Sequence, residues 1–240
     1  MAAKTPGRLV TLVRRAHQSA CLLLPGAGGG LNPYLRLASF VGSTHAVYAV
    51  RAAGLVPGEE PEDTVDGMAD SAVEALDGSG LTPEVVIGWS LGGAIAWEVC
   101  VRLSERGHRP DLVLVDSFPL ARESALAADA RLRDVVLDML GPRPDPATVD
   151  RVRRTVDAQM SALARYRTER PYAGRVLMLM CSDADFPMRD EAAARWRSLA
   201  SDLTAGRLAA DHFGVFDPEH LPQLTGEIAA FLGLPAGVAR

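Results

Sequence analysis

The sequence predicts an α/β protein in which a mostly parallel sheet is covered by helices on both faces. Short apolar runs rich in Leu, Val and Ile alternate with amphipathic segments of helical period along the 240 residues. The runs are apolar throughout instead of alternating with polar residues, which is typical of strands buried on both faces. The length suits one large core, so we expect residues 1–240 to form a single domain.

The composition narrows the class of protein. Hydrophobic residues make up 48% and charged residues 23%, as in a globular protein, and the net charge of -5 argues against nucleic acid as the main partner. No apolar run is long enough to span a bilayer, and residues 1–17 lack the apolar region of a signal peptide, so no membrane partner is expected. Cys21, Cys100 and Cys181 have no metal-ligand spacing, which favours buried free thiols in a cytoplasmic protein without a metal.

The first third of the chain predicts three strands and two helices. Gly7–Arg14 alternates weakly between apolar and polar residues, as an edge strand does. Ala20–Leu24 is a buried strand, and Pro33–Val41 is a short helix. His45–Val50 is the next strand, and a Gly- and Pro-rich loop then leads to Glu62–Leu76, where one apolar face at helical spacing predicts an amphipathic helix.

The middle of the chain carries the motif around which the rest is organised. The β-branched run that ends in Gly88-Trp89-Ser90-Leu91-Gly92 is followed by an Ala-rich helix from Ala94 to Ser104. In this strand–turn–helix context, G-x-S-x-G indicates a nucleophile elbow, whereas the alternative is a glycine-rich turn of an unrelated α/β protein. The tight turn requires the glycines, because a Cβ at Gly88 or Gly92 would collide with the neighbouring strand and helix, which pack close to the turn. We therefore expect Ser90 to be a nucleophile.

The remaining sequence predicts three more strands and a helical insertion. Residues 121–171 are helical in pattern, rich in Arg and Ala, and interrupted by Gly141–Pro146. The segment is too long for a simple crossover, so it is interpreted as a helical lid between two sheet strands. The other elements are expected to be strands at Asp111–Val115, Arg175–Cys181 and Leu203–Leu208, and helices at Ala192–Leu199 and Leu221–Leu232.

A serine nucleophile needs a base, and in this kind of fold the base follows the serine in the order serine, acid, histidine. Only His108, His212 and His220 follow Ser90. His108 lies in a polar loop at the far end of the helix from Ser90, and His220 immediately precedes the last helix. His212 follows the last strand, at the sheet edge where Ser90 also lies, and is the predicted base.

The acid has two candidate positions. Asp116 ends the strand after the elbow helix, whereas Asp183 and Asp185 follow the next strand. All three carboxylates emerge at the same edge of the sheet, so position alone leaves the choice open. The glycine-rich loop at residues 25–30 lacks the spacing of a phosphate-binding motif and is interpreted as the source of a second oxyanion-binding amide.

Four segments together resemble a known family. Gly88–Gly93, Pro25–Gly29, Val115–Ser117 and Asp211–Phe213 are similar to the thioesterase domains of nonribosomal peptide and polyketide synthases, within the α/β-hydrolase superfamily. The resemblance extends from Ala20 to Leu232. It implies an α/β-hydrolase fold with a helical lid, a Ser90–His212–acid triad, and oxyanion-binding amides at Leu91 and Ala27.

The resemblance also bears on the acid. In chain-terminating members of the family the acid follows the strand after the elbow helix, which corresponds to Asp116. In discrete editing (type II) members it follows the next strand, at Asp183 or Asp185. The Val-Asp-Ser match at 115–117 makes Asp116 the predicted acid. The short chain with its own Met1 looks more like a discrete protein, but an excised domain would also explain its length.

The implied function is the release of an acyl or peptidyl chain from the phosphopantetheine thioester of a carrier protein, by hydrolysis or macrocyclisation through an acyl-enzyme on Ser90. The setting would be polyketide, nonribosomal peptide or antibiotic biosynthesis, with a carrier protein as partner and no cofactor. The alternatives are a type II editing thioesterase, a general carboxylesterase and a non-catalytic carrier-binding protein. Six arginines of the predicted lid region form either a carrier-docking rim or a solvated face: Arg151, Arg153, Arg154, Arg165, Arg167 and Arg170.

Overall fold

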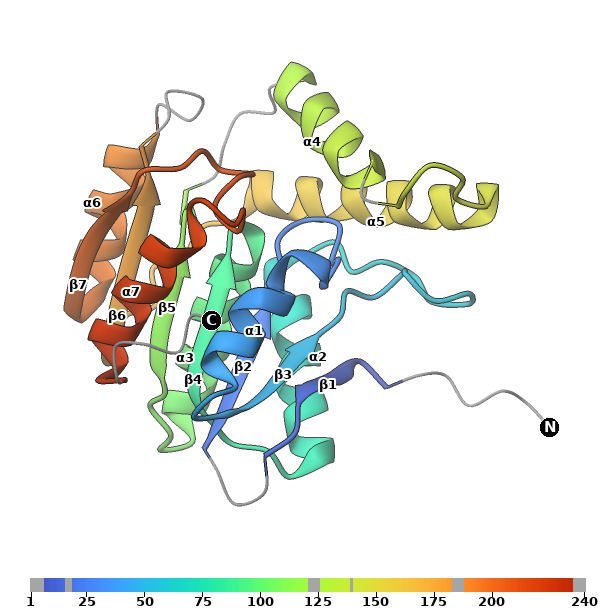
Figure 1. The fold of residues 1–240 in the computed structure, drawn as a ribbon. Coiled ribbons are helices and arrows are strands. Elements are labelled where there is room, and N and C mark those ends of the chain that lie inside the picture. Colours follow the sequence, from blue (N-terminus) through green and yellow to red (C-terminus); the bar gives the residue numbers. More distant parts are fainter. Residues whose placement is uncertain (1–6, 16–18, 121–125, 139, 183–187, 235–240) are drawn as a thin grey trace.

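A computed structural model describes residues 7–15, 19–120, 126–138, 140–182 and 188–234 (Figure 1). They form one seven-stranded sheet in the order β1-β3-β2-β4-β5-β6-β7. The edge strand β1 (Leu9–Val13) is antiparallel to β3 (Ala46–Val50), and every other neighbouring pair is parallel. The predicted mostly parallel α/β sheet is confirmed.

The inner strands end together at one edge of the sheet. In register, Leu24 is opposite Gly88, and Trp89 is opposite Val115, so the residues that follow these strands are close neighbours. This edge therefore gathers residues that are far apart in sequence. The strands besides β1 and β3 are β2 (Ala20–Leu24), β4 (Pro83–Trp89), β5 (Asp111–Val115), β6 (Tyr172–Cys181) and β7 (Ala200–Leu208).

Helices cover both faces of the sheet (Figure 1). Alternate residues of β2 explain why the strand is apolar throughout, because Leu22 and Leu24 pack into one core while Cys21 and Leu23 pack into the other. The first core is shared with α2 (Val65–Ser79), α3 (Leu91–Glu105) and α6 (Arg189–Leu199). The second is shared with α1 (Leu35–Val41), which follows a short 3-10 turn at Asn32–Tyr34, and with α7 (Leu221–Leu232).

Several element boundaries differ from the prediction. The helix expected from Glu62 begins at Val65, because the Thr64 side chain caps it by accepting a hydrogen bond from the Gly67 amide. The strand expected from Arg175 begins at Tyr172, which pairs with Ala200 before a register shift that ends at Arg175. The helix after Ser90 begins at Leu91 instead of Ala94, since its first turn contains the glycines of the motif.

Two helices connect β5 to β6 and lie beyond the carboxyl ends of the strands (Figure 1). They are α4 (Leu126–Asp138) and α5 (Pro146–Arg165), and Asp145 caps α5 by accepting the Thr148 amide. The prediction of a helical segment broken near Gly141–Pro146 is therefore confirmed. Among the residues described, no helix is long and apolar enough to cross a membrane.

Candidate active site

Ser90 lies in a strained turn between β4 and α3. Its backbone has φ 56° and ψ -123°, a conformation that is unfavourable for a residue with a side chain. A Cβ on Gly88 would lie 2.2 Å from the carbonyl oxygen of Gly92, and a Cβ on Gly92 would lie 2.0 Å from that of Leu24. Gly88 is thus blocked by the first turn of α3 and Gly92 by the end of the neighbouring strand β2, which agrees with the predicted collision with a neighbouring strand and helix. The turn requires glycine because backbone, not side chain, fills the space.

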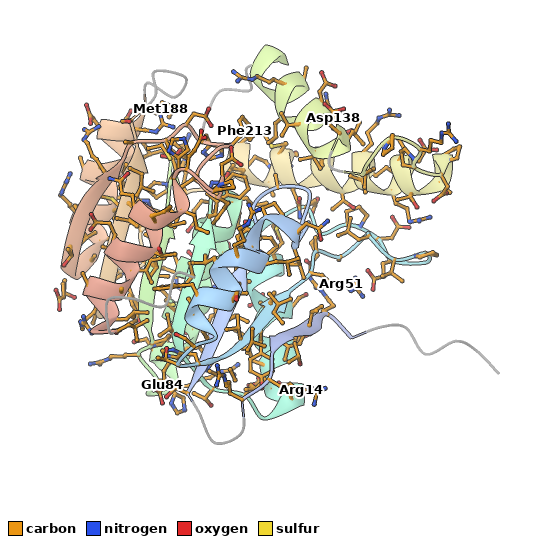
Figure 2. The ribbon with its side chains drawn as sticks, viewed as in Figure 1. Arg14, Arg51, Glu84, Asp138, Met188 and Phe213 are labelled. Carbon is orange, nitrogen blue, oxygen red and sulfur yellow. The ribbon has the colours of Figure 1, made fainter. Side chains whose placement is uncertain are left out.

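His212 faces the serine. Its Nε2 lies 3.0 Å from the Ser90 Oγ, within hydrogen-bond distance, and the residue is buried. The imidazole packs against the Trp89 indole, with ring centroids 5.0 Å apart. The Asp211 carboxylate accepts the amides of Phe213 and Gly214, which fixes the turn that carries the imidazole. Figure 2 shows Phe213 at the end of the sheet near α4 and α5, opposite the end that carries Glu84.

Asp116 completes a chain of hydrogen bonds. Its Oδ2 lies 2.6 Å from the Nδ1 of His212, and the residue is fully buried directly after β5. Its backbone has φ 42°, and its amide donates to the Leu179 carbonyl at 2.7 Å. The structure therefore brings Ser90, His212 and Asp116 together in the order that serine nucleophiles require.

Arg189 holds the other side of the same carboxylate. Arg189 is the first residue of α6. Its Nε donates to Oδ1 of Asp116 and its Nη2 donates to Oδ2, each at 2.8 Å. The Cys181 amide also donates to Oδ1, at 3.0 Å. Burial opposes ionisation of Asp116, but the hydrogen bonds from Arg189 and His212 outweigh it and hold the pKa of Asp116 well below its ordinary value. The carboxylate is thus ionised throughout the physiological range.

The other candidates from the sequence lie elsewhere. His108 is exposed in its loop, and His220 immediately precedes α7, where its ring lies 3.4 Å from the Glu219 carboxylate. Asp183 and Asp185 fall outside the described residues. Within the described ranges, no group of three or more His, Cys, Asp and Glu side chains is arranged to hold a metal ion.

The glycine-rich loop at residues 25–30 lies beside the elbow, and three of its amides are occupied. The Gly26 amide donates to the Tyr34 hydroxyl at 2.8 Å, the Gly28 amide to the Gln159 side chain at 2.7 Å, and the Gly29 amide to the Gly26 carbonyl at 3.1 Å. Burial raises the pKa of Tyr34 well above its ordinary value, so its hydroxyl stays neutral. Hydrogen bonds among the described residues engage neither the Ala27 amide nor the Leu91 amide.

A largely apolar cavity of about 150 Å³ adjoins the loop and lies under both connecting helices. The loop and the Trp89 ring supply part of its wall, α4 supplies three apolar side chains, and α5 supplies one. No charged side chain lines it among the residues described. A chain of apolar atoms fits such a space better than a charged group does. The residues that define it best are Ala27, Trp89, Leu132, Val136, Val152 and Phe213.

The six arginines do not act as one patch. Arg170 pairs with the buried Glu98 and with Glu105, at 2.9 and 2.6 Å, so it serves the fold. Arg151 donates to the Thr148 hydroxyl at 2.7 Å. The side chain of Arg165 approaches Asp63 at 3.9 Å, at a largely exposed position. The remaining three, Arg153, Arg154 and Arg167, are exposed.

Two residues at this site were not predicted from the sequence. Arg189 sits beside Asp190 and Glu191 and looks like an ordinary charged residue at a helix start. Gln159 lies among the apolar residues of α5 and is buried. A polar residue at a core position of an amphipathic helix is a signal that could have identified Gln159, because such residues need a hydrogen-bond partner.

The sequence and the fold of this chain are similar to those of known proteins. The model of the thioesterase domain family matches residues 21–232. A stretch of 102 residues, 41% of this chain, is 31% identical to nonribosomal peptide synthetase btyA of Aspergillus terreus, of which it covers only 11%. This chain therefore corresponds to a small part of that relative's length.

Two solved structures share the fold over nearly the whole chain. The NocB thioesterase domain, in covalent complex with a fluorophosphonate nocardicin G analog, is 28% identical, with a TM-score of 0.77 and coverage of 94% of this chain and 99% of that chain. YbtT, the type II thioesterase of the yersiniabactin pathway, is 21% identical, with a TM-score of 0.74 and coverage of 94% and 98%.

Proposed function

Since this chain belongs to the thioesterase domain family and is a serine hydrolase, we propose that it releases an acyl or peptidyl chain from the phosphopantetheine thioester of a carrier protein. The setting we infer is nonribosomal peptide or polyketide biosynthesis, as in the synthetase related by sequence. The observation that carries the proposal is the series of hydrogen bonds from the Ser90 hydroxyl through His212 to Asp116. This series supports acyl transfer by a serine nucleophile.

In the proposed reaction, His212 Nε2 removes the hydroxyl proton as Ser90 Oγ attacks the thioester carbonyl. Asp116 holds the imidazole by its Nδ1 and stabilises the imidazolium that forms. The amides of Leu91 and Ala27 donate to the oxyanion, and loss of one such donor costs about 3–4 kcal/mol of transition-state stabilisation. The carbon–sulfur bond then breaks, the pantetheine thiol leaves with the proton from His212, and the acyl chain remains on Ser90.

The acyl-enzyme is then resolved by a second nucleophile. His212 removes a proton from water, or from an amine or hydroxyl of the acyl chain itself, and the new nucleophile displaces Ser90 Oγ. Water gives a free acid, whereas an internal group gives a ring. The helices α4 and α5 overlie the cavity, so we propose that they act as the lid that governs access of water.

The position of the acid favours chain release over editing. Asp116 accepts a hydrogen bond from His212 after β5, and this is the position that chain-terminating members of the family use. The apolar cavity supports an acyl group whose first atoms are uncharged. For the carrier partner we propose the exposed arginines of α5 as the docking side, since carrier domains are acidic and bear a phosphate.

The decisive experiment is intact-mass trapping on Ser90. A panel of acyl-pantetheine thioesters is incubated with the wild-type protein and with Ser90→Ala, and p-nitrophenyl esters of equal chain length are run in parallel. We expect a mass increase of one acyl group only in the wild type, and faster turnover of thioesters than of esters. Faster turnover of the esters would indicate a general carboxylesterase, and the absence of any adduct or turnover would contradict the proposal.

A separate experiment tests the docking side. Arg153→Glu with Arg154→Glu reverses the charge of two exposed residues of α5, and we expect a higher KM for carrier-bound acyl groups with unchanged kinetics on small thioesters. Arg207→Glu, an exposed arginine on β7, is the matched control. Equal kinetics of the double variant and the wild type on carrier-bound substrate would exclude this surface.

A further inference from the structure

The helix α5 reaches the reaction centre through one buried side chain. Gln159 accepts the Gly28 amide through Oε1 at 2.7 Å, across 131 positions of sequence, and is only 5% exposed. Its neighbours on the same face include Val152, Val156 and Met160, so an apolar residue would pack there equally well. Burying an amide side chain costs free energy unless the amide is hydrogen-bonded. The hydrogen bond to Gly28 is therefore what glutamine provides at this position and leucine does not.

The hydrogen bond from the Gly28 amide to Gln159 restrains a turn that its own backbone restrains only weakly. Residues 26–29 are closed by the bond from the Gly29 amide to the Gly26 carbonyl, and Gly28 has φ +89°, which favours glycine. Glycine adopts either sign of φ readily, so the central peptide between Ala27 and Gly28 can rotate unless a partner fixes it. Gln159 is that partner, since it receives the amide of this peptide.

The Ala27 amide lies between two backbone amides that are each fixed by a hydrogen bond to a side chain. The Tyr34 hydroxyl accepts the amide before it in the chain, and Gln159 accepts the amide after it. The Ala27 amide itself has no hydrogen bond within the described residues, so it is available to a ligand. We propose that Gln159 is a positioning residue that aims the Ala27 amide at the oxyanion. This inference depends on the function proposed above, in which that amide serves as a donor.

The segment that directly follows α5 is tied to α3, the helix that carries the other donor. The buried Glu98 of α3 accepts the Tyr166 hydroxyl at 3.1 Å and pairs with Arg170 at 2.9 Å, just beyond the end of α5. Because α3 begins at Leu91, polar contacts of the C-terminal part of α5 and of the residues after it connect the two oxyanion amides. A displacement of α5 would therefore alter the reaction centre as well as the cavity.

Three variants test the role of Gln159 on a small acyl-pantetheine thioester, with fluorophosphonate labelling of Ser90 as a second readout. Gln159→Leu removes the acceptor at similar side-chain volume. We expect kcat and the labelling rate to fall about tenfold, with KM within about twofold of the wild type. The loss is smaller than for complete removal of an oxyanion donor, because a misoriented Ala27 amide still provides part of the stabilisation. Gln159→Glu keeps an acceptor and should retain most of the rate. Gln159→Asn withdraws the amide by one methylene group and should lose rate as Leu does.

The control is Thr155→Val, one helical turn earlier on the same face. Thr155 is fully buried, and its hydroxyl has no hydrogen-bond partner among the residues that the structure describes, so the variant should match the wild type. Wild-type rates for both Gln159→Leu and Gln159→Asn would overturn the inference, and so would an equal loss in Thr155→Val. If Gln159→Leu does not fold, Gln159→Asn decides alone. Failure of the proposed function is distinguishable, because then the wild type itself would neither turn over thioesters nor acquire the label.

Discussion

The Ser90 elbow and the loop at residues 25–30 face the same reaction centre, yet different forces hold them. The elbow is held by backbone, its own and that of the end of β2, because main-chain atoms fill the space at Gly88 and Gly92. The loop is held by two side chains, the Tyr34 hydroxyl and the Gln159 amide, which come from separate elements. One half of the site therefore has no freedom to adjust, whereas the other half depends on how the rest of the molecule packs.

The largest effect is expected at the elbow. Gly92→Ala places a Cβ 2.0 Å from the Leu24 carbonyl oxygen, and neither backbone can yield without displacing β2 or α3. We expect no detectable fluorophosphonate labelling of Ser90 and a markedly lower melting temperature. Gly226→Ala is the control, because it has open space within α7 and should stabilise the helix by up to about 1 kcal/mol. Normal labelling of Gly92→Ala would show that the elbow adapts as the loop does.

The next effect tests the acid, which is also held by side chains. Asp116→Asn keeps the shape but favours the wrong orientation of the His212 proton, so we expect kcat to fall about 10,000-fold in steady-state assays. Asp183→Asn and Asp185→Asn serve as controls with near wild-type rates. A small loss in Asp116→Asn together with a large loss in either control would move the acid to the later strand.

Arg189 should matter for stability and its pH dependence. Arg189→Met leaves the buried Asp116 carboxylate without its strongest partner, and breaking such a pair typically costs about 3–5 kcal/mol, measurable by chemical denaturation. The folded pKa of Asp116 is depressed, so its contribution is present above the ordinary aspartate pKa of about 4 and is lost as pH falls towards the folded value. We therefore expect a shallower loss of stability below that pH in the variant.

The control for Arg189→Met is Arg197→Met, an exposed position two turns later on α6, which should leave the stability nearly unchanged. An acid dependence identical to that of the wild type would mean that Arg189 does not set the ionisation of Asp116.

The smallest effect is expected at the loop. Tyr34→Phe removes the acceptor of the Gly26 amide at a buried site, which should cost about 1–3 kcal/mol of stability. Rates should fall only a few-fold, since Gln159 still holds the other side of Ala27. Tyr48→Phe, a half-buried tyrosine on β3 near the antiparallel edge, is the control. A rate loss as large as that of Asp116→Asn would mean that the loop is as rigidly determined as the elbow.

The same contrast explains how much the sequence could predict. The elbow was predictable because strand, glycines and helix are adjacent in sequence, and His212 because it follows the last strand at the edge that Ser90 shares. Position alone left the choice among three aspartates open, since all follow strands expected to end at that edge, and the family match at residues 115–117 was needed to select Asp116. Arg189 and Gln159 could not be assigned a role, because their partners lie 73 and 131 positions away and only tertiary packing brings them together.

The bond between Gln159 and Gly28 also constrains protein engineering. Exchanging residues 146–165 for the corresponding segment of a related enzyme is an obvious way to broaden the range of acyl groups accepted. Such a graft would replace the acceptor of the Gly28 amide along with the cavity wall. Chimeras that keep glutamine at this position, or that transfer the glycine-rich loop together with the helix, should therefore retain more turnover than those that exchange the helix alone.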